Sequence, residues 1–142
     1  MKFLITILSF IIVEQSCNQK KIYQNSIELE YTAISRGIFK KIILNNKTIS
    51  VFNKQDSIQA SKPCDDETWK LILEELHQID IKNILNLKAP SEKRFFDGAA
   101  IGNFKISYNG KTYETPSFDH GNPPKEIAQL VKEMLSISEN IE

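Results

Sequence analysis

Residues 104–115 read Phe104-Lys-Ile-Ser-Tyr-Asn-Gly-Lys-Thr-Tyr-Glu-Thr115, and the pair Asn109-Gly110 separates two alternating runs. Asn-Gly suits a two-residue type I′ turn, because both central positions of that turn require a positive φ. A turn at this pair makes Ile106 face Tyr113 on one side of the hairpin, and makes Lys105 face Glu114 on the other. The stretch therefore predicts an antiparallel hairpin with one apolar face and one polar face.

The same register brings two loops together at the open end of the hairpin, Phe95–Ala100 and Pro116–Asn122. We expect any functional site of the protein to lie at this end. The candidate site residues on and beside these loops are Arg94, Asp97, Asp119 and His120.

Two interpretations of this cluster compete. In the first, Asp119 or Asp97 orients the imidazole of His120 as a general base, and Arg94 holds an anionic group. In the second, the cluster is a structural latch in which Arg94 pairs with Asp119 and Asp97-Gly98 forms a turn. The latch interpretation also expects three phenylalanines to pack beneath the loops, namely Phe95, Phe96 and Phe118. We favour the latch, and we expect no catalytic residue.

Alternating apolar residues predict three further strands upstream of the hairpin, at 27–33, 39–44 and 48–53. The last two form a second hairpin whose turn is either Asn45-Asn46 or Asn46-Lys47. We prefer Asn46-Lys47, because that turn places four apolar side chains on one face. The polar stretch 54–63 predicts a loop.

Two helices are expected. The spacing of Trp69, Ile72, Leu76 and Ile79 predicts an amphipathic helix over 66–78, capped by Asp65 or Asp66. Residues 81–90 predict irregular chain or one short helical turn. A last helix is expected to begin at Asn122-Pro123-Pro124, with Asn122 as the N-cap.

This order of elements predicts a single two-layer α+β domain over 27–138, followed by a frayed tail at 139–142. About five antiparallel strands in hairpins form the sheet, and two helices pack on one face. The chain has 142 residues, a hydrophobic content of 41% and a net charge of zero. A neutral chain lacks the basic surface that nucleic acid requires, so we expect no nucleic-acid partner.

Motifs for metal or cofactor binding are not found in the sequence. The two histidines are far apart, and the chain contains no Cys-x-x-Cys, phosphate-binding loop or dinucleotide fingerprint. We therefore expect no metal, no cofactor and no enzymatic activity.

The first residues have the pattern of a signal peptide. Lys2 precedes the apolar run Phe3–Val13, which is too short to span a bilayer, and Ser16 precedes Cys17. We expect residues 1–16 to be removed, Cys17 to be lipidated, and 17–26 to tether the domain. The alternative is plain secretion with Cys17 as a free thiol. A lipidated Cys17 leaves Cys64 without a disulfide partner, and we expect Cys64 to be an inert, partly buried thiol.

The run Ser16–Lys21, together with Arg94–Ala100 and Tyr113–Pro124, resembles small uncharacterised lipoproteins of Bacteroidetes-type bacteria. The resemblance implies a location in the cell envelope and a small α+β domain, but no activity, ligand or catalytic residue. No acidic run follows Cys17, so the domain is expected to face the periplasm.

The sequence thus favours a non-enzymatic envelope lipoprotein that is a binding or structural module. Its expected partners are the membrane, through the lipid on Cys17, and an unidentified envelope protein. Two alternatives stay open: an inhibitor of a protease or lysozyme, and a small hydrolase that uses His120 with Asp119 or Asp97.

Overall fold

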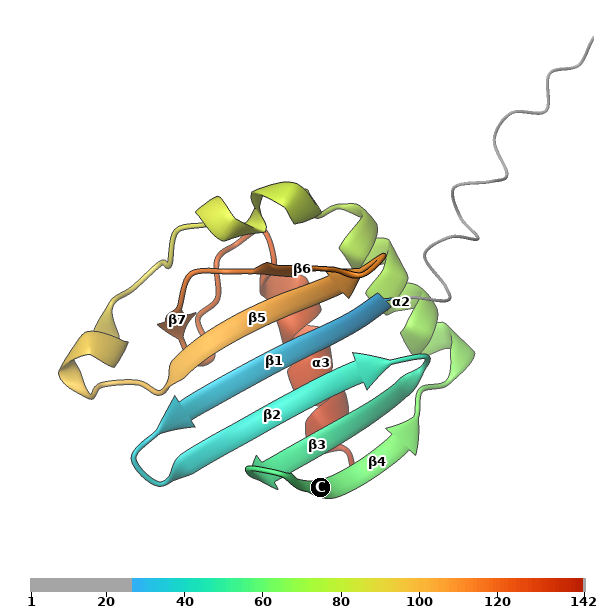
Figure 1. The fold of residues 1–142 in the computed structure, drawn as a ribbon, viewed down its shortest axis with the longest axis horizontal. Coiled ribbons are helices and arrows are strands. Elements are labelled where there is room, and N and C mark those ends of the chain that lie inside the picture. Colours follow the sequence, from blue (N-terminus) through green and yellow to red (C-terminus); the bar gives the residue numbers. More distant parts are fainter. Residues whose placement is uncertain (1–26, 142) are drawn as a thin grey trace, which may run out of the picture.

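The computed structural model describes residues 27–141, which form a seven-stranded sheet, two α-helices and two short 3₁₀-helices (Figure 1). The strands are β1 (Ile27–Ser35), β2 (Ile38–Asn45), β3 (Thr48–Lys54), β4 (Ser57–Pro63), β5 (Ile101–Tyr108), β6 (Lys111–Glu114) and β7 (Phe118–Asp119). The helices are α2 (Asp66–His77), α3 (Ala128–Glu139), η1 (Ile81–Asn86) and η2 (Lys93–Phe96). The predicted signal peptide at 1–16, Cys17 and the tether at 17–26 lie outside the described residues.

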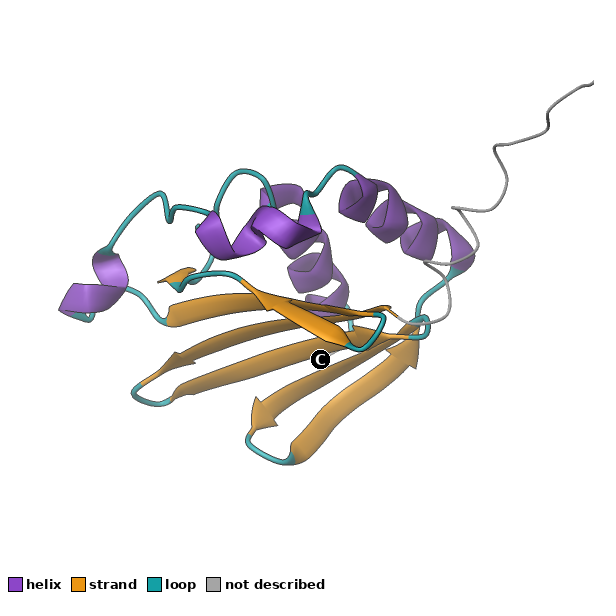
Figure 2. Ribbon diagram, turned by 45° about the horizontal axis from the view of Figure 1, so that its top comes forward, coloured by secondary structure: helices purple, strands orange, loops and turns teal. Residues whose placement is uncertain are grey.

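The sheet is antiparallel throughout and has the strand order β4-β3-β2-β1-β5-β6, with β7 paired to β5. Both α-helices lie on one face of the sheet, and the other face is open (Figure 2). This arrangement confirms the predicted two-layer α+β fold. Seven strands are present in the described residues, two more than the sequence predicted.

The predicted register of the β5–β6 hairpin is confirmed. Ile106 pairs with Tyr113 and Lys105 pairs with Glu114. Asn109 and Gly110 have φ values of 50° and 73°, as a type I′ turn requires.

The β2–β3 hairpin also has the preferred register. Leu44 pairs with Ile49 and Ile42 pairs with Val51. Asn46 and Lys47 form the turn, with φ values of 48° and 60°. All four apolar side chains of these pairs are fully buried.

The prediction of a loop over 54–63 was wrong, because Ser57–Pro63 forms the edge strand β4 beside β3. Most side chains of β4 are exposed, so neither face imposes the alternation of apolar residues that reveals a half-buried strand. The pairing with β3 contains register shifts between Val51 and Lys54, which further obscure the pattern.

The last helix begins later than predicted. Its first residue is Ala128 and its N-cap is Ile127, whereas Asn122 donates its side-chain amide to Ser91 Oγ. A residue that precedes proline is disfavoured in the helical region, which keeps Asn122 and Pro123 extended. At the other end, α3 runs through Glu139 and Ile141 packs against the core, so the tail predicted to fray is in part helical.

One hydrophobic core fills the space between the sheet and the helices. The sheet contributes alternate residues of β1, β2, β3 and β5, and the helices contribute their apolar stripes. The largest fully buried side chains are Tyr31, Phe104, Phe118, Leu29, Ile42, Leu44, Ile49, Ile72, Leu76, Ile84, Ile106 and Ile127. Gly102 lies against the ring of Phe118, so closely that a Cβ at this position would be 2.9 Å from Cε2 of that ring.

Candidate functional site

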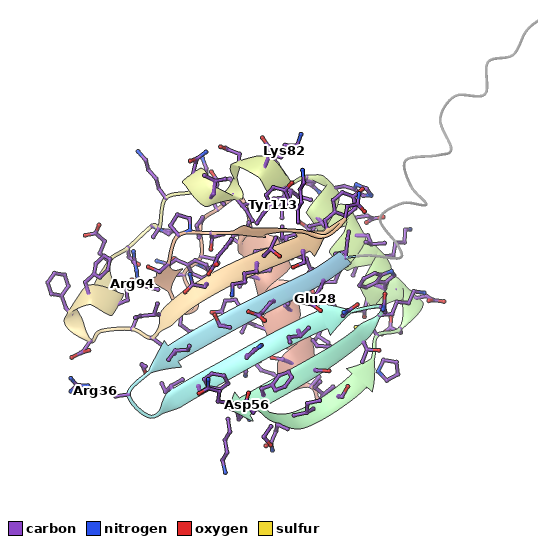
Figure 3. The ribbon with its side chains drawn as sticks, viewed as in Figure 1. Glu28, Arg36, Asp56, Lys82, Arg94 and Tyr113 are labelled. Atoms are coloured by element: carbon purple, nitrogen blue, oxygen red, sulfur yellow. The ribbon has the colours of Figure 1, made fainter. Side chains whose placement is uncertain are left out.

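The candidate cluster lies at one end of the sheet, which we call the distal end. This end carries the β1–β2 turn, the start of β5, η2 and β7 (Figure 1). Arg94 and Arg36 are both at this end of the molecule (Figure 3).

Asp119 is the centre of a buried hydrogen-bond network. Its carboxylate accepts hydrogen bonds from Ser91 Oγ at 2.5 Å, from the backbone amides of Lys93 and Arg94 at 2.8 and 2.9 Å, and from Arg94 Nη1 at 3.1 Å. The side chain of Asp119 is 2% exposed and that of Arg94 is 7% exposed. The carboxylate therefore fixes the backbone of η2 and neutralises the buried guanidinium.

Arg94 makes further contacts that hold it in place. Its Nε donates to Ser117 Oγ at 3.1 Å, and its Nη1 donates to the carbonyl oxygen of Ser91 at 2.7 Å. The ring of Phe95 lies over the guanidinium, whose carbon is 4.2 Å from the ring centroid. This cation–π contact screens the ion pair between Arg94 and Asp119 from water.

The network also determines the ionisation of Asp119. Burial alone would raise the pKa of this carboxyl group. The hydrogen bonds from Ser91, Arg94 and Lys93 outweigh burial and hold the pKa of Asp119 well below its usual range. Asp119 is therefore a permanently charged acceptor at neutral pH, and it is unsuited to proton transfer.

His120 points away from Asp119. It lies in the turn that follows β7, and its Nδ1 is 2.6 Å from the hydroxyl of Tyr31 on β1. Burial raises the pKa of Tyr31 to about 12, against the opposing effect of a backbone hydrogen bond with Gly121. The hydroxyl therefore stays protonated at neutral pH and shares a hydrogen bond with Nδ1 of the imidazole.

Asp97 contacts neither the hydrogen-bond network of Asp119 nor the Tyr31–His120 pair described above. It is the exposed C-cap of η2, with a φ of 57°. Together with Arg36, Ile38 and Ala100 it lines a shallow hollow of about 440 Å³ between the β1–β2 turn and the chain that leads into β5. The structure therefore brings Arg94 and Asp119 together but places Asp97 and His120 elsewhere.

The expectation that three phenylalanines pack beneath the loops was right for Phe118 only. Phe118 is fully buried, whereas Phe95 and Phe96 are 64% and 83% exposed. Asp119 binds the amides of Lys93 and Arg94, which turns Arg94 inward and leaves the next two side chains facing solvent. Sequence reasoning also missed Ser91, Ser117, Asn122 and Tyr31 as partners, because they lie far along the chain from the residues they contact.

Cys64 lies in surroundings that disfavour its thiolate form. The thiol is partly buried. Burial, together with the adjacent charge of Asp65, raises its pKa. A thiol of this kind stays protonated and unreactive at neutral pH.

Two further observations apply only to residues 27–141. No three His, Cys, Asp or Glu side chains there are grouped so that they could hold a metal ion. Within the same range, no helix has the length and hydrophobicity that crossing a membrane requires.

We expect His120 to make the stability of the domain depend on pH. Burial lowers the pKa of His120, and the nearby charge of Lys40 lowers it further. The unfolded chain therefore takes up this proton first as the pH falls below about 6.5, and the folded state loses stability. We expect the Tm of the parent protein to fall more than that of His120→Gln between pH 7 and pH 5. Equal slopes in thermal melts of the two proteins would contradict this assignment.

Comparison with known proteins finds no match to the chain among protein-family models, curated proteins or solved structures.

Proposed function

We propose that the protein is a lipid-anchored component of a bacterial cell envelope and that its domain is a binding module rather than an enzyme. The proposal of a binding module rests on the hydrogen bonds that Asp119 and His120 make. The carboxylate is committed to Ser91, Lys93 and Arg94, and the imidazole is bonded to Tyr31. Neither group is placed to activate the other.

The predicted anchor precedes the strand end that lies farthest from the distal end. The chain enters the domain at Ile27, which pairs with Tyr108 beside the β5–β6 turn. At the far end of β1, Ile34 pairs with Ile101 near η2. β1 contains nine residues, so its two ends are roughly 26 Å apart. A chain that carries a lipid on Cys17 would therefore join the domain at the end opposite the distal end.

A narrower version of the proposal is an inhibitor of an envelope protease or lysozyme. One specific observation favours it, namely that η2 presents two exposed phenylalanines on a backbone held by Asp119. Inhibitors of this kind insert a preorganised loop into an enzyme cleft, which lowers the entropic cost of binding. This similarity concerns the mode of presentation and specifies no particular enzyme.

The anchoring proposal is tested by metabolic labelling with an alkyne fatty acid. We expect the full chain to carry the label and to partition with membranes, and we expect Cys17→Ser to lose both properties. Cys64→Ser is the matched control and should label like the parent protein. Label that persists on Cys17→Ser, or a mature protein that keeps Met1, would contradict the anchor.

A further inference from the structure

The helix α3 lies on one face of the sheet, and its outer side borders a groove of about 570 Å³ (Figure 2). The buried residues of α3 belong to the core between the helices and the sheet. Ala128, Val131 and Leu135 line the groove with apolar side chains, and residues 121–123 of the turn after β7 form its opposite wall. Part of the apolar surface of α3 therefore faces outward rather than into the core.

Two opposite charges lie on this outer face. Lys132 and Glu139 both line the groove and are exposed. They are seven positions apart, which is close to two helical turns, so they share one face and are separated by roughly 10.5 Å along the helix axis. Neither forms an ion pair with another described residue. The positions three and four residues from each of them carry no opposite charge, so α3 itself cannot pair them.

The position of Glu139 is unfavourable within the monomer. Glu139 is the last residue of α3. The C-terminal end of a helix carries a partial negative charge, which disfavours an acidic side chain there. The stability of the helix therefore does not explain this residue, whereas a positive group from outside the chain would.

A second copy of the chain carries the complementary charges at the same spacing. Contacts about a two-fold axis are reciprocal, because each copy presents the same surface to the other. If two α3 helices pack antiparallel with the axis between Leu135 and Ser136, Lys132 of each copy faces Glu139 of the other. In this register the small side chain of Ser136 leaves room for Leu135 of the second copy.

We propose that the outer face of α3 is a homodimer interface, in which a second copy of this chain packs its own α3 antiparallel along the groove. Apolar contact at Leu135 holds the two helices together, and two reciprocal ion pairs between Lys132 and Glu139 set the register. One helix face is smaller than an interface of standard size, so the dimer is weak and reversible. This inference goes beyond the proposed function and does not depend on the lipid anchor.

The first test is cysteine crosslinking in the cells that make the protein, with Ser136→Cys in a full chain that also carries Cys64→Ser. We expect mild oxidation to give a disulfide-linked homodimer, because the two copies of position 136 lie beside the axis, within reach of a disulfide. Ser57→Cys is the matched control, since Ser57 is also exposed but lies on β4. The Cys64→Ser chain alone measures any dimer formed through Cys17. Homodimer from position 136 no greater than in these two controls, or an adduct with a different protein only, would overturn the proposal.

The second test reverses the charges in the Ser136→Cys background. Lys132→Glu and Glu139→Lys are each expected to lower the homodimer yield by about 10-fold, because each places like charges at both ends of the interface. The double variant restores both ion pairs and should restore the yield. The two single variants, made together with different tags, should also crosslink to each other.

The fold of the variants is checked by thermal melting. Glu139→Lys removes an acid from the C-terminal end of α3, so its Tm should equal or exceed that of the parent protein. A lower homodimer yield from this variant then reports loss of the interface rather than loss of the fold. Equal yields from all variants, or a double variant as weak as the single ones, would overturn the proposal.

Discussion

Replacement of Asp119 by alanine is expected to lower the Tm of the domain by about 10 °C or more, because it leaves a buried guanidinium without a counter-ion. The same change leaves the amides of Lys93 and Arg94 and the hydroxyl of Ser91 without their acceptor. Each unsatisfied buried donor adds a desolvation cost. Thermal melting followed by circular dichroism measures the effect.

Two comparisons isolate the cause of this loss. Glu74→Gln removes the exposed pair between Lys70 and Glu74, where the side chains are 76% and 55% exposed, and should change the Tm by less than about 2 °C. Asp119→Asn keeps the shape but removes the charge, and should cost nearly as much as alanine. The pKa of Asp119 lies below its usual range, so its contribution is present above about pH 4 and is lost as the pH falls further. A Tm for Asp119→Ala within 2 °C of the parent would refute the latch.

Phe118→Ala is expected to destabilise the domain by about 3–5 kcal/mol, as loss of a fully buried phenylalanine ring does in other cores. The ring is 0% exposed, its centroid lies 6.2 Å from that of Tyr31, and it covers Gly102. Removal leaves a cavity that the sheet cannot close by a local shift. Chemical denaturation measures the free energy of unfolding of each variant.

Gly102→Ala supplies the partner variant for this experiment. In the parent protein a methyl group at Gly102 meets the Phe118 ring, and we expect a cost of about 1–3 kcal/mol. In the Phe118→Ala background the contact with the ring is gone, so the cost should fall to that of the remaining 3.3 Å approach to the carbonyl oxygen of residue 118. Additive effects in the double-mutant cycle would show that the ring does not constrain Gly102.

The sequence predicted those parts of the fold that local patterns specify. The turns Asn109-Gly110 and Asn46-Lys47, together with the alternation on either side, were enough to set both hairpin registers. The spacing of apolar residues also predicted the buried face of α2. The sequence offered Asp65 as a cap of this helix, and its carboxylate accepts a hydrogen bond from the backbone amide of Thr68 at 2.8 Å. β4 was missed because an exposed edge strand needs no apolar alternation.

The candidate site was predictable only in part. The opposite charges of Arg94 and Asp119, on loops joined by a known register, led to the expectation of their ion pair, and the structure contains it. The hydroxyl of Ser91 is 28 positions from Asp119, and no local pattern marks it as a ligand of that carboxylate. The outward position of Phe96 could not be predicted either, because it depends on which amides Asp119 binds.

The strand β4 leaves one edge of the sheet unpaired. An unpaired strand edge is a template on which other chains can polymerise. Here the edge ends in Lys62-Pro63, where a charge and a missing amide interrupt any added ladder, and the register shifts near Phe52 distort its start. At the opposite side of the sheet, η1 packs against β6. Both margins of the sheet therefore carry features that disfavour pairing with a strand of another chain.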